Sequence, residues 1–370
     1  MNKFIFYILF FFTYSIVNAN EINQPKNVLF IMVDDLRPEL FIYAKDHIKS
    51  PNIDALAAQG VTFNRAYCNV PVCGASRASI LSGVRPTQDR FLTYYSSINE
   101  AGPQTEHIVD YFNKRGYTTI SNNKITHLKN DIKSWDEEWY PKDISWRNYQ
   151  DPKNRQLDRE KKPAAAYEML DVDDEVYFDG QTAQKSIEDL KKLKNSNSPF
   201  FLAVGFVKPH LPFTAPKKYW DLYNKSDIKL PNQNILPESA PNQANHQWGE
   251  LRRYNGIPKK GPIDHEMSKT LIHAYYASVS YVDAQIGKIL NALDNFGLRD
   301  KTIVVLVGDH GWSLSEHGLW AKHSNFEVAL HVPMIISAPN FPENVKTNSI
   351  AELVDICLLY TSPSPRDPIG

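Results

Sequence analysis

The sequence predicts an α/β fold with a core of buried parallel strands. Short apolar runs alternate with longer helix-like stretches along the chain after residue 26. That order favours an α/β architecture over an all-β one. The runs are continuously apolar and lack a period of two, which is typical of parallel strands covered on both faces.

The first predicted strand is Val28–Val33. Similar apolar runs occupy Tyr117–Ser121, Phe200–Val207, Ile303–Val307 and Met334–Ser337. Helical patterns lie between them, at Asn52–Gln59, Cys73–Ser82, Thr105–Lys114, Thr182–Lys194 and Leu271–Phe296. Gly60, Gly116 and Gly297 follow three of these helices, where a residue in the left-handed conformation commonly ends a helix.

The first nineteen residues predict a secretory signal peptide. Lys3 gives a positive start, residues 4–17 form an apolar stretch, and Ala19 ends a small-residue cleavage site. A membrane anchor is the alternative, but a span needs about 20 apolar residues. We therefore expect export without stable membrane insertion after cleavage. The destination is the periplasm or the exterior, or the lysosome if the source is an animal.

The charge balance argues against nucleic acid as a partner. The chain has 41 basic and 42 acidic residues, for a formal net charge of −1, whereas nucleic-acid-binding domains usually carry a basic excess. A hydrophobic fraction of 42% is enough for a sizeable core. The three cysteines do not suggest a disulfide framework.

Two long polar stretches, residues 135–170 and 230–262, interrupt the alternation of elements. Strands resume after each, so we interpret them as surface insertions that either shape a binding site or decorate the surface. Residues 351–356 begin a further amphipathic element. Residues 357–370 are rich in proline near their end, and we expect them not to continue that helix. We interpret them as a non-native tail that replaces a C-terminal subdomain.

Polar residues stand where the predicted strands end. Asp34 and Asp35 follow the first strand, and Asp309 and His310 follow the run that ends at Val307. The other two strands are followed by Lys124 and His127 and by His210. Ligand sites of open α/β sheets form beyond the carboxyl ends of the strands, so we expect these side chains to meet at one edge.

The converging carboxylates predict a metal site. Three or more of them would repel one another strongly unless a cation neutralised them. Oxygen-rich ligation favours calcium or magnesium over zinc. A zinc or two-metal phosphatase site is the alternative, and it would need more histidines at ligand spacing.

Cys73 is placed where a cysteine can be reactive. Pro71 and Gly74 suit a turn, and the following residues suit a helix, so Cys73 lies near a helix N-terminus that favours an anion. Arg77, one turn later, can hold an oxyanion through two parallel hydrogen bonds. A buried, unreactive cysteine is the alternative interpretation.

The run Cys73-Gly74-Ala75-Ser76-Arg77 resembles the type I sulfatase signature, Cys-x-Pro/Ala-Ser-Arg, in which the cysteine is converted to Cα-formylglycine. Three further runs resemble the iduronate-2-sulfatase branch of that family: residues 27–38, 208–213 and 308–326. The resemblance covers residues 26–356. Asn123 departs from the pattern, because glycine usually precedes the lysine that stands here at position 124.

The resemblance implies an alkaline-phosphatase/sulfatase-like domain over residues 26–356, with a mixed, mainly parallel sheet and helices on both faces. It also implies one Ca²⁺ ion and a hydrated formylglycine, or gem-diol, that attacks sulfur. The implied metal ligands are Asp34, Asp35, Cys73, Asp309 and His310. The implied catalytic residues are Cys73, Arg77 and Lys124 around the nucleophile, His127 as its base, and His210 and Lys322 on the sulfate and the leaving oxygen.

Three further residues are implied to contact the sugar: Arg37, Trp312 and His317. In the resembling branch such residues recognise a uronate with a 2-O-sulfate, and an arginine suits its carboxylate. Arg37 can equally pair with Glu39. The expected substrate is a sulfated glycan, such as a glycosaminoglycan or an algal polysaccharide. A formylglycine-generating enzyme, or its equivalent, is the expected maturation partner.

Two other functions remain open at this point. The chain could be a phosphate-ester or phosphonate-monoester hydrolase of the same superfamily, since those enzymes share the sheet and a metal-and-anion site. It could also be a non-catalytic glycan-binding relative, which would be expected to lack a ligand or the nucleophile.

Overall fold

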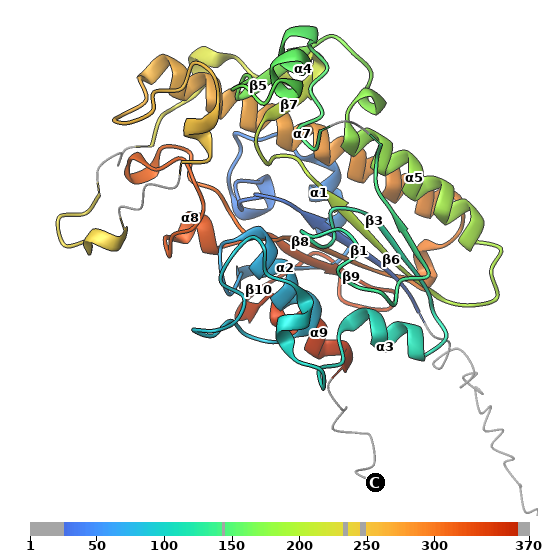
Figure 1. Ribbon diagram of the computed structural model, residues 1–370. Coiled ribbons are helices and arrows are strands. Elements are labelled where there is room, and N and C mark those ends of the chain that lie inside the picture. The colour runs from blue at the N-terminus through green and yellow to red at the C-terminus, as the bar shows by residue number, and fades with distance from the viewer. Residues whose placement is uncertain (1–25, 143–144, 232–235, 245–248, 362–370) are drawn as a thin grey trace, which may run out of the picture.

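The computed structural model describes residues 26–142, 145–231, 236–244 and 249–361 (Figure 1). The signal peptide predicted in residues 1–19 and the tail residues 362–370 lie outside the described part. Within that part, no helix combines the length and the apolar character that crossing a bilayer requires.

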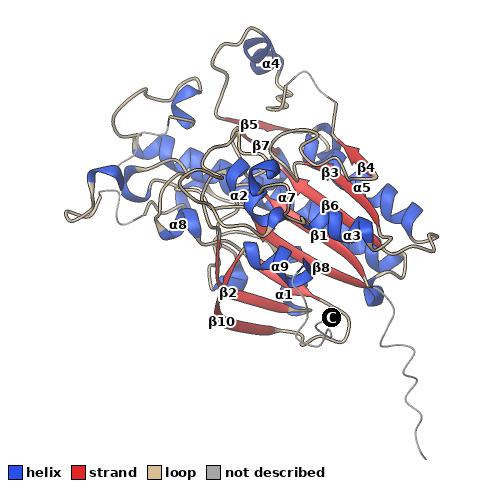
Figure 2. Cartoon of the chain, turned by 60° about the horizontal axis from the view of Figure 1, so that its bottom comes forward, coloured by secondary structure: helices blue, strands red, loops and turns tan. Residues whose placement is uncertain are grey.

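An eight-stranded sheet forms the centre of the molecule, in the order β10-β2-β9-β8-β1-β6-β3-β4 (Figure 2). Only β9 runs antiparallel to its neighbours, which confirms the mixed, mainly parallel sheet. The strands are β1 Asn27–Val33, β2 Val61–Tyr67, β3 Thr118–Asn123, β4 Glu137–Trp139, β6 Phe200–Phe206, β8 Thr302–Gly308, β9 Met334–Ser337 and β10 Val345–Glu352. A second sheet pairs β5 (Tyr167–Leu170) with β7 (Phe213–Pro216).

Helices cover both faces of the large sheet, as predicted, with α5 and α7 on one side and α2, α3 and α9 on the other (Figure 1). Alternate residues of β1 divide the core: Leu29, Ile31 and Val33 pack with α1, α5 and α7, whereas Val28 and Phe30 pack with α2, α3 and α9. The helices are α1 Pro51–Ala58, α2 Cys73–Ser82, α3 Ile108–Lys114, α4 Pro152–Arg159, α5 Phe178–Leu193, α6 Lys217–Trp220, α7 His265–Asn295, α8 Glu327–Leu330 and α9 Val354–Thr361.

The register of the central strands aligns their carboxyl ends. Val33 at the end of β1 pairs with Phe206 of β6 and Gly308 of β8. On the far side of β6, Gly205 pairs with Asn123, the last residue of β3. The residues that follow these four strands therefore leave the sheet at one edge.

The C-terminal region differs from the sequence-based expectation. Helix α9 does not end at residue 356 but continues to Thr361, and Cys357 within it is fully buried. The prolines begin only at Pro363, so they do not interrupt this helix. The prediction that residues after 356 cannot extend the helix is therefore wrong for residues 357–361.

Two of the three predicted glycine caps are confirmed. Gly116 and Gly297 have φ angles of 78° and 67°. Gly60 has an ordinary φ and serves another purpose: a Cβ there would lie 2.4 Å from the carbonyl oxygen of Ile336. Glycine at this position allows the end of α1 to approach β9.

Candidate active site

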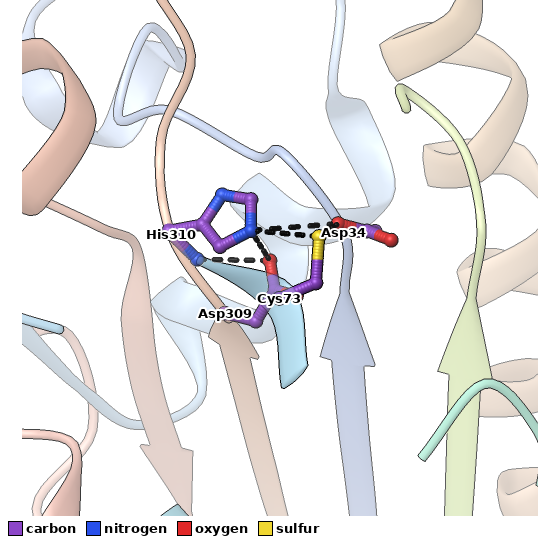
Figure 3. Close-up of side chains that lie close together, drawn as sticks. All are labelled: Asp34, Cys73, Asp309 and His310. Atoms are coloured by element: carbon purple, nitrogen blue, oxygen red, sulfur yellow. Dashed lines mark hydrogen bonds and ion pairs between the residues drawn. The ribbon is translucent and has the colours of Figure 1, made fainter. Parts of the chain in front are cut away.

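Four buried side chains converge beyond the carboxyl ends of β1 and β8: Asp34, Cys73, Asp309 and His310 (Figure 3). One ligand atom from each lies within 4.8 Å of the others. The Sγ atom of Cys73 is 3.1 Å from Nε2 of His310 and 3.5 Å from Oδ1 of Asp34. The convergence predicted from the strand ends is therefore present.

Cys73 is the first residue of α2, as the turn and helix pattern predicted. Gly74 allows the close packing there, because a Cβ at that position would lie 2.2 Å from the carbonyl oxygen of Tyr94. The hydroxyl of Ser76 donates a 2.6 Å hydrogen bond to the carbonyl of Asp309 and fixes the helix to the end of β8.

The electrostatic surroundings favour an anion at Cys73. Burial raises the pKa of the thiol, but the charges of Lys322, His310 and Lys124 and a hydrogen bond with His127 lower it well below its usual range. A position that stabilises a thiolate also suits another anionic nucleophile.

Arg77 contacts carboxylates and backbone rather than an open oxyanion position. Its Nε donates to Oδ2 of Asp309 at 2.7 Å, and its Nη1 donates to the carbonyls of Lys124 and Ile125. Nη2 lies 3.8 Å from Oδ2 of Asp34. The side chain is fully buried and positions the two aspartates. Its expected role in stabilising the nucleophile stays a prediction.

Asp35 adopts a φ of 58°, which turns its carboxylate toward two partners. One is Nζ of Lys322 at 2.9 Å, and the other is Nδ1 of His310 at 3.2 Å. Its backbone N–H donates to Oδ1 of Asp309. Tyr275 of α7 fixes the turn by donating to the carbonyl of Asp35 at 2.7 Å.

Lys124 and His127 follow β3, as expected. Asn123 takes a φ of 65°, a conformation that glycine and asparagine tolerate best, so the departure from the glycine pattern keeps the backbone geometry. Gly205 of β6 allows the approach, because a Cβ there would lie 2.1 Å from the Lys124 carbonyl group. Lys124 forms an ion pair with Asp34, and His127 lines the same cavity as Cys73.

His210 and Lys322 share a partner that the sequence did not indicate. Glu250 places Oε1 at 3.1 Å from Nε2 of His210 and Oε2 at 3.5 Å from Nζ of Lys322. It lies in the polar stretch 230–262, where no hydrophobic pattern or strand end marks one glutamate above the other charged residues. No sequence signal could have found it.

These groups open onto a cavity of about 640 Å³. Its lining includes Cys73 and the four basic residues predicted to act on the ester, which are Lys124, His127, His210 and Lys322. Both long insertions contribute to it: Trp146 and Arg147 come from residues 135–170, and Glu250, Arg253 and Tyr254 come from residues 230–262. Of the two interpretations of the insertions, site-shaping is therefore the one that holds.

The three residues expected to contact the sugar do not line this cavity. Arg37 is 4% exposed and pairs with Glu39 and Glu316, both at 2.7 Å. Trp312 is fully buried, and its ring lies under the Lys322 ammonium, 5.1 Å from the ring centroid to Nζ. His317 stacks on Phe326 at 4.4 Å between ring centroids. Trp312 packs against Lys322 of the cavity lining, and the sugar contacts of all three residues stay a prediction.

The donor set fits a hard divalent cation. Asp34, Cys73, Asp309 and His310 form one possible ligand group. Asp34 and Asp35 also come close to His210, but both nitrogens of that ring already have partners in Leu211 and Glu250, so His210 is not a ligand. Burial and Cys73 raise the pKa of Asp34, but Lys124, His210 and Arg77 lower it below its usual range, so this ligand is ionised. Charge alone does not require a metal, because Arg77 and two lysines already contact the carboxylates. The convergence of ligand atoms is the better argument for a metal site.

Comparison with known proteins gives one family. The family described as Sulfatase matches residues 26–357. Iduronate 2-sulfatase of Homo sapiens is 35% identical over 359 residues, which is 93% of this chain and 64% of the relative. A sulfatase of Formosa agariphila is 33% identical over 365 residues, 91% of this chain and 68% of that protein. The chain thus spans somewhat less than two thirds of the human relative.

Solved structures agree on the fold. The phosphonate monoester hydrolase of Agrobacterium radiobacter superposes with a TM-score of 0.72 at 22% identity, covering 90% of this chain and 72% of that one. A second structure, solved with its substrate D-glucosamine-2-N,6-O-disulfate, has a TM-score of 0.68 at 20% identity and covers 93% of this chain and 78% of its own. At these identities the likeness shows the architecture alone.

Proposed function

The chain belongs to the sulfatase family, and from that membership we propose that it hydrolyses sulfate esters of a glycan with a nucleophile derived from Cys73. One observation carries the proposal: the signature cysteine lies in the lining of a cavity together with the basic residues that the chemistry needs, Lys124, His127, His210 and Lys322. Buried carboxylates adjoin the cysteine.

We propose that Cys73 is converted to Cα-formylglycine by a maturation enzyme. Hydrated formylglycine supplies one hydroxyl for attack on sulfur and a second whose deprotonation expels sulfate. His127 is placed to take a proton from this centre, because it lines the same cavity as Cys73 and burial lowers its pKa, which keeps the imidazole neutral. Lys124, which forms an ion pair with Asp34, stabilises negative charge there.

His210 and Lys322 are the residues that we assign to the sulfate and the leaving oxygen. Both line the cavity, and Lys322 is 2.9 Å from Asp35. Two adjacent cations hold the sulfate oxygens and offset the charge that develops on them in the transition state. His210 can also donate a proton to the leaving sugar oxygen.

Asp34, Asp35, Asp309 and His310, with the side chain at position 73, would hold one Ca²⁺ ion. An ion in this place offsets charge on the nucleophile and on the sulfuryl group. Arg77 positions two of the ligands through its bond to Asp309 and its proximity to Asp34.

For the substrate we propose a sulfated glycan, with a 2-O-sulfated uronate as the first candidate because the human relative is an iduronate 2-sulfatase. The cavity supports this choice: Arg147 and Arg253 line it and suit the further anionic groups of such a glycan. Export by a signal peptide in residues 1–19 completes the proposal and rests on the sequence alone.

Turnover of matched esters tests the function. The mature protein is expected to hydrolyse 4-nitrophenyl sulfate much faster than 4-nitrophenyl phosphate or a phenylphosphonate ester, and Cys73→Ala is expected to abolish all three activities. Preference for the phosphorus esters would make the chain a phosphoester or phosphonate-monoester hydrolase of this fold. Glycan binding without any turnover would indicate the non-catalytic relative.

A further inference from the structure

Glu250 is an acidic side chain of the cavity lining that neither the signature nor the strand ends predicted. Building on the proposed function, we propose that Glu250 is a positioning residue that keeps both nitrogens of His210 protonated and directs it to donate a proton to the leaving oxygen. The carboxylate forms ion pairs with His210 and Lys322.

The hydrogen bonds of His210 define its protonation. Nδ1 lies 2.6 Å from the carbonyl oxygen of Leu211, and a carbonyl only accepts, so Nδ1 carries a hydrogen. Nε2 lies 3.1 Å from Oε1 of Glu250. An ionised carboxylate also only accepts, so Nε2 carries a hydrogen as well. With two donors the ring is an imidazolium, which is the form that can give up a proton.

The charges around His210 agree with this protonation. Burial, Lys322 and Lys124 lower its pKa, but Glu250 and Asp34 outweigh them and raise it to about 9. Without Glu250, a buried imidazolium beside Lys322 would face a like charge with no screening from water. The same carboxylate is 3.5 Å from the Lys322 ammonium, so it lies between two cations that would otherwise repel each other.

Packing restricts where the ring can point. His210 is buried, and its ring and that of Trp146 pack edge to face with 5.5 Å between ring centroids. Nδ1 is held by Leu211 on the backbone side, which leaves Nε2 as the nitrogen beside Glu250. His210 and Glu250 both line the cavity, so an ester oxygen can replace the carboxylate as the acceptor of this hydrogen.

The proton balance is simple. As the bond between sulfur and the sugar oxygen breaks, the Nε2 proton passes to that oxygen, and the alcohol leaves uncharged. His210 becomes a neutral imidazole whose Nδ1 still donates its hydrogen to the Leu211 carbonyl, and Glu250 stays ionised throughout. A solvent proton restores the imidazolium before the next turnover.

Substrates that differ in their need for this proton give the test. A sugar alkoxide is a poor leaving group and requires protonation, whereas 4-nitrophenolate leaves without it. For Glu250→Gln we expect kcat on a 2-O-sulfated uronate to fall about 100-fold, and kcat on 4-nitrophenyl sulfate to fall less than about threefold. Glu250→Asp is expected to recover part of the sugar activity.

Glu238→Gln is the matched control, an exposed glutamate of the same polar stretch, and should leave both activities at the wild-type level. Equal losses on the two substrates would assign Glu250 a merely structural role and overturn the inference. So would an unchanged sugar activity. If the mature wild-type protein hydrolysed neither ester, the proposed function would fall as well, which is a different outcome from an altered ratio.

Discussion

The imidazole Nε2 of His310 lies 3.1 Å from the Sγ of Cys73, although 237 positions separate the two residues in the chain. The parallel register of β1 and β8 brings His310 to the sheet edge, and the start of α2 brings Cys73. This contact joins the nucleophile position to the carboxylate cluster.

Asp309→Asn should abolish metal-dependent turnover. The substitution removes a candidate ligand charge and the acceptor of the 2.7 Å bond from Arg77. We expect kcat/KM for 4-nitrophenyl sulfate to fall by about 100-fold or more. The measurement compares both proteins after chelation and after return of Ca²⁺. Wild-type activity that survives chelation unchanged would count against the metal assignment.

His127→Ala should slow all sulfate esters alike. We assign His127 to the nucleophile rather than to the leaving group. The decrease in rate when it is removed should therefore not depend on which alcohol is released. We expect kcat to fall about 100-fold or more on both 4-nitrophenyl sulfate and a sugar sulfate. A loss confined to the sugar ester would instead place His127 at the leaving oxygen.

Hydrolysis of a sugar sulfate should lose rate at alkaline pH. The pKa of His210 is raised to about 9, and the protonated ring is the active form. Activity is therefore retained through neutral pH and falls as pH rises through about 9. The pH profile of kcat for a sugar sulfate measures this fall in activity at alkaline pH. A fall centred at the ordinary histidine pKa, about 6.5, would contradict the assigned environment.

Helix α9 should contribute to stability. Ile356 is 2% exposed and packs in the core with α2 and α3, whereas Leu359 on the same helix is 65% exposed. We expect Ile356→Ala to lower the free energy of unfolding by about 2–5 kcal/mol, while Leu359→Ala leaves it nearly unchanged. Denaturant titration of both variants measures these changes in the free energy of unfolding. Equal, small effects would mean that this helix is not packed on the domain.

The central fold could be predicted because its strands are buried on both faces. Val28–Val33 shows this as an uninterrupted apolar run. The outer strands carry no such signal. Strand β10 exposes most of its side chains, and β2 is only partly buried. Both are polar for much of their length, so hydrophobicity alone could not separate them from loops.

The site residues divide in the same way, into those marked by an apolar run and those without such a signal. Asp34, Asp309 and His310 were found because they interrupt apolar runs at strand ends. Glu250 and Trp146 reach the cavity from polar insertions, where tertiary folding alone selects which side chain points inward. Arg37 and Trp312 lie near a motif, and in the folded chain ion pairs and core packing hold them. Their assignment to the substrate stays a prediction.

The chemical state of residue 73 is the most direct measurement. Mass spectrometry of the peptide that contains Cys73, on preparations matured to different extents, gives the fraction of aldehyde in each. Sulfate-ester turnover should rise in proportion to that fraction and vanish when only the thiol is present. Full activity in a preparation whose residue 73 is entirely unmodified cysteine would contradict the account.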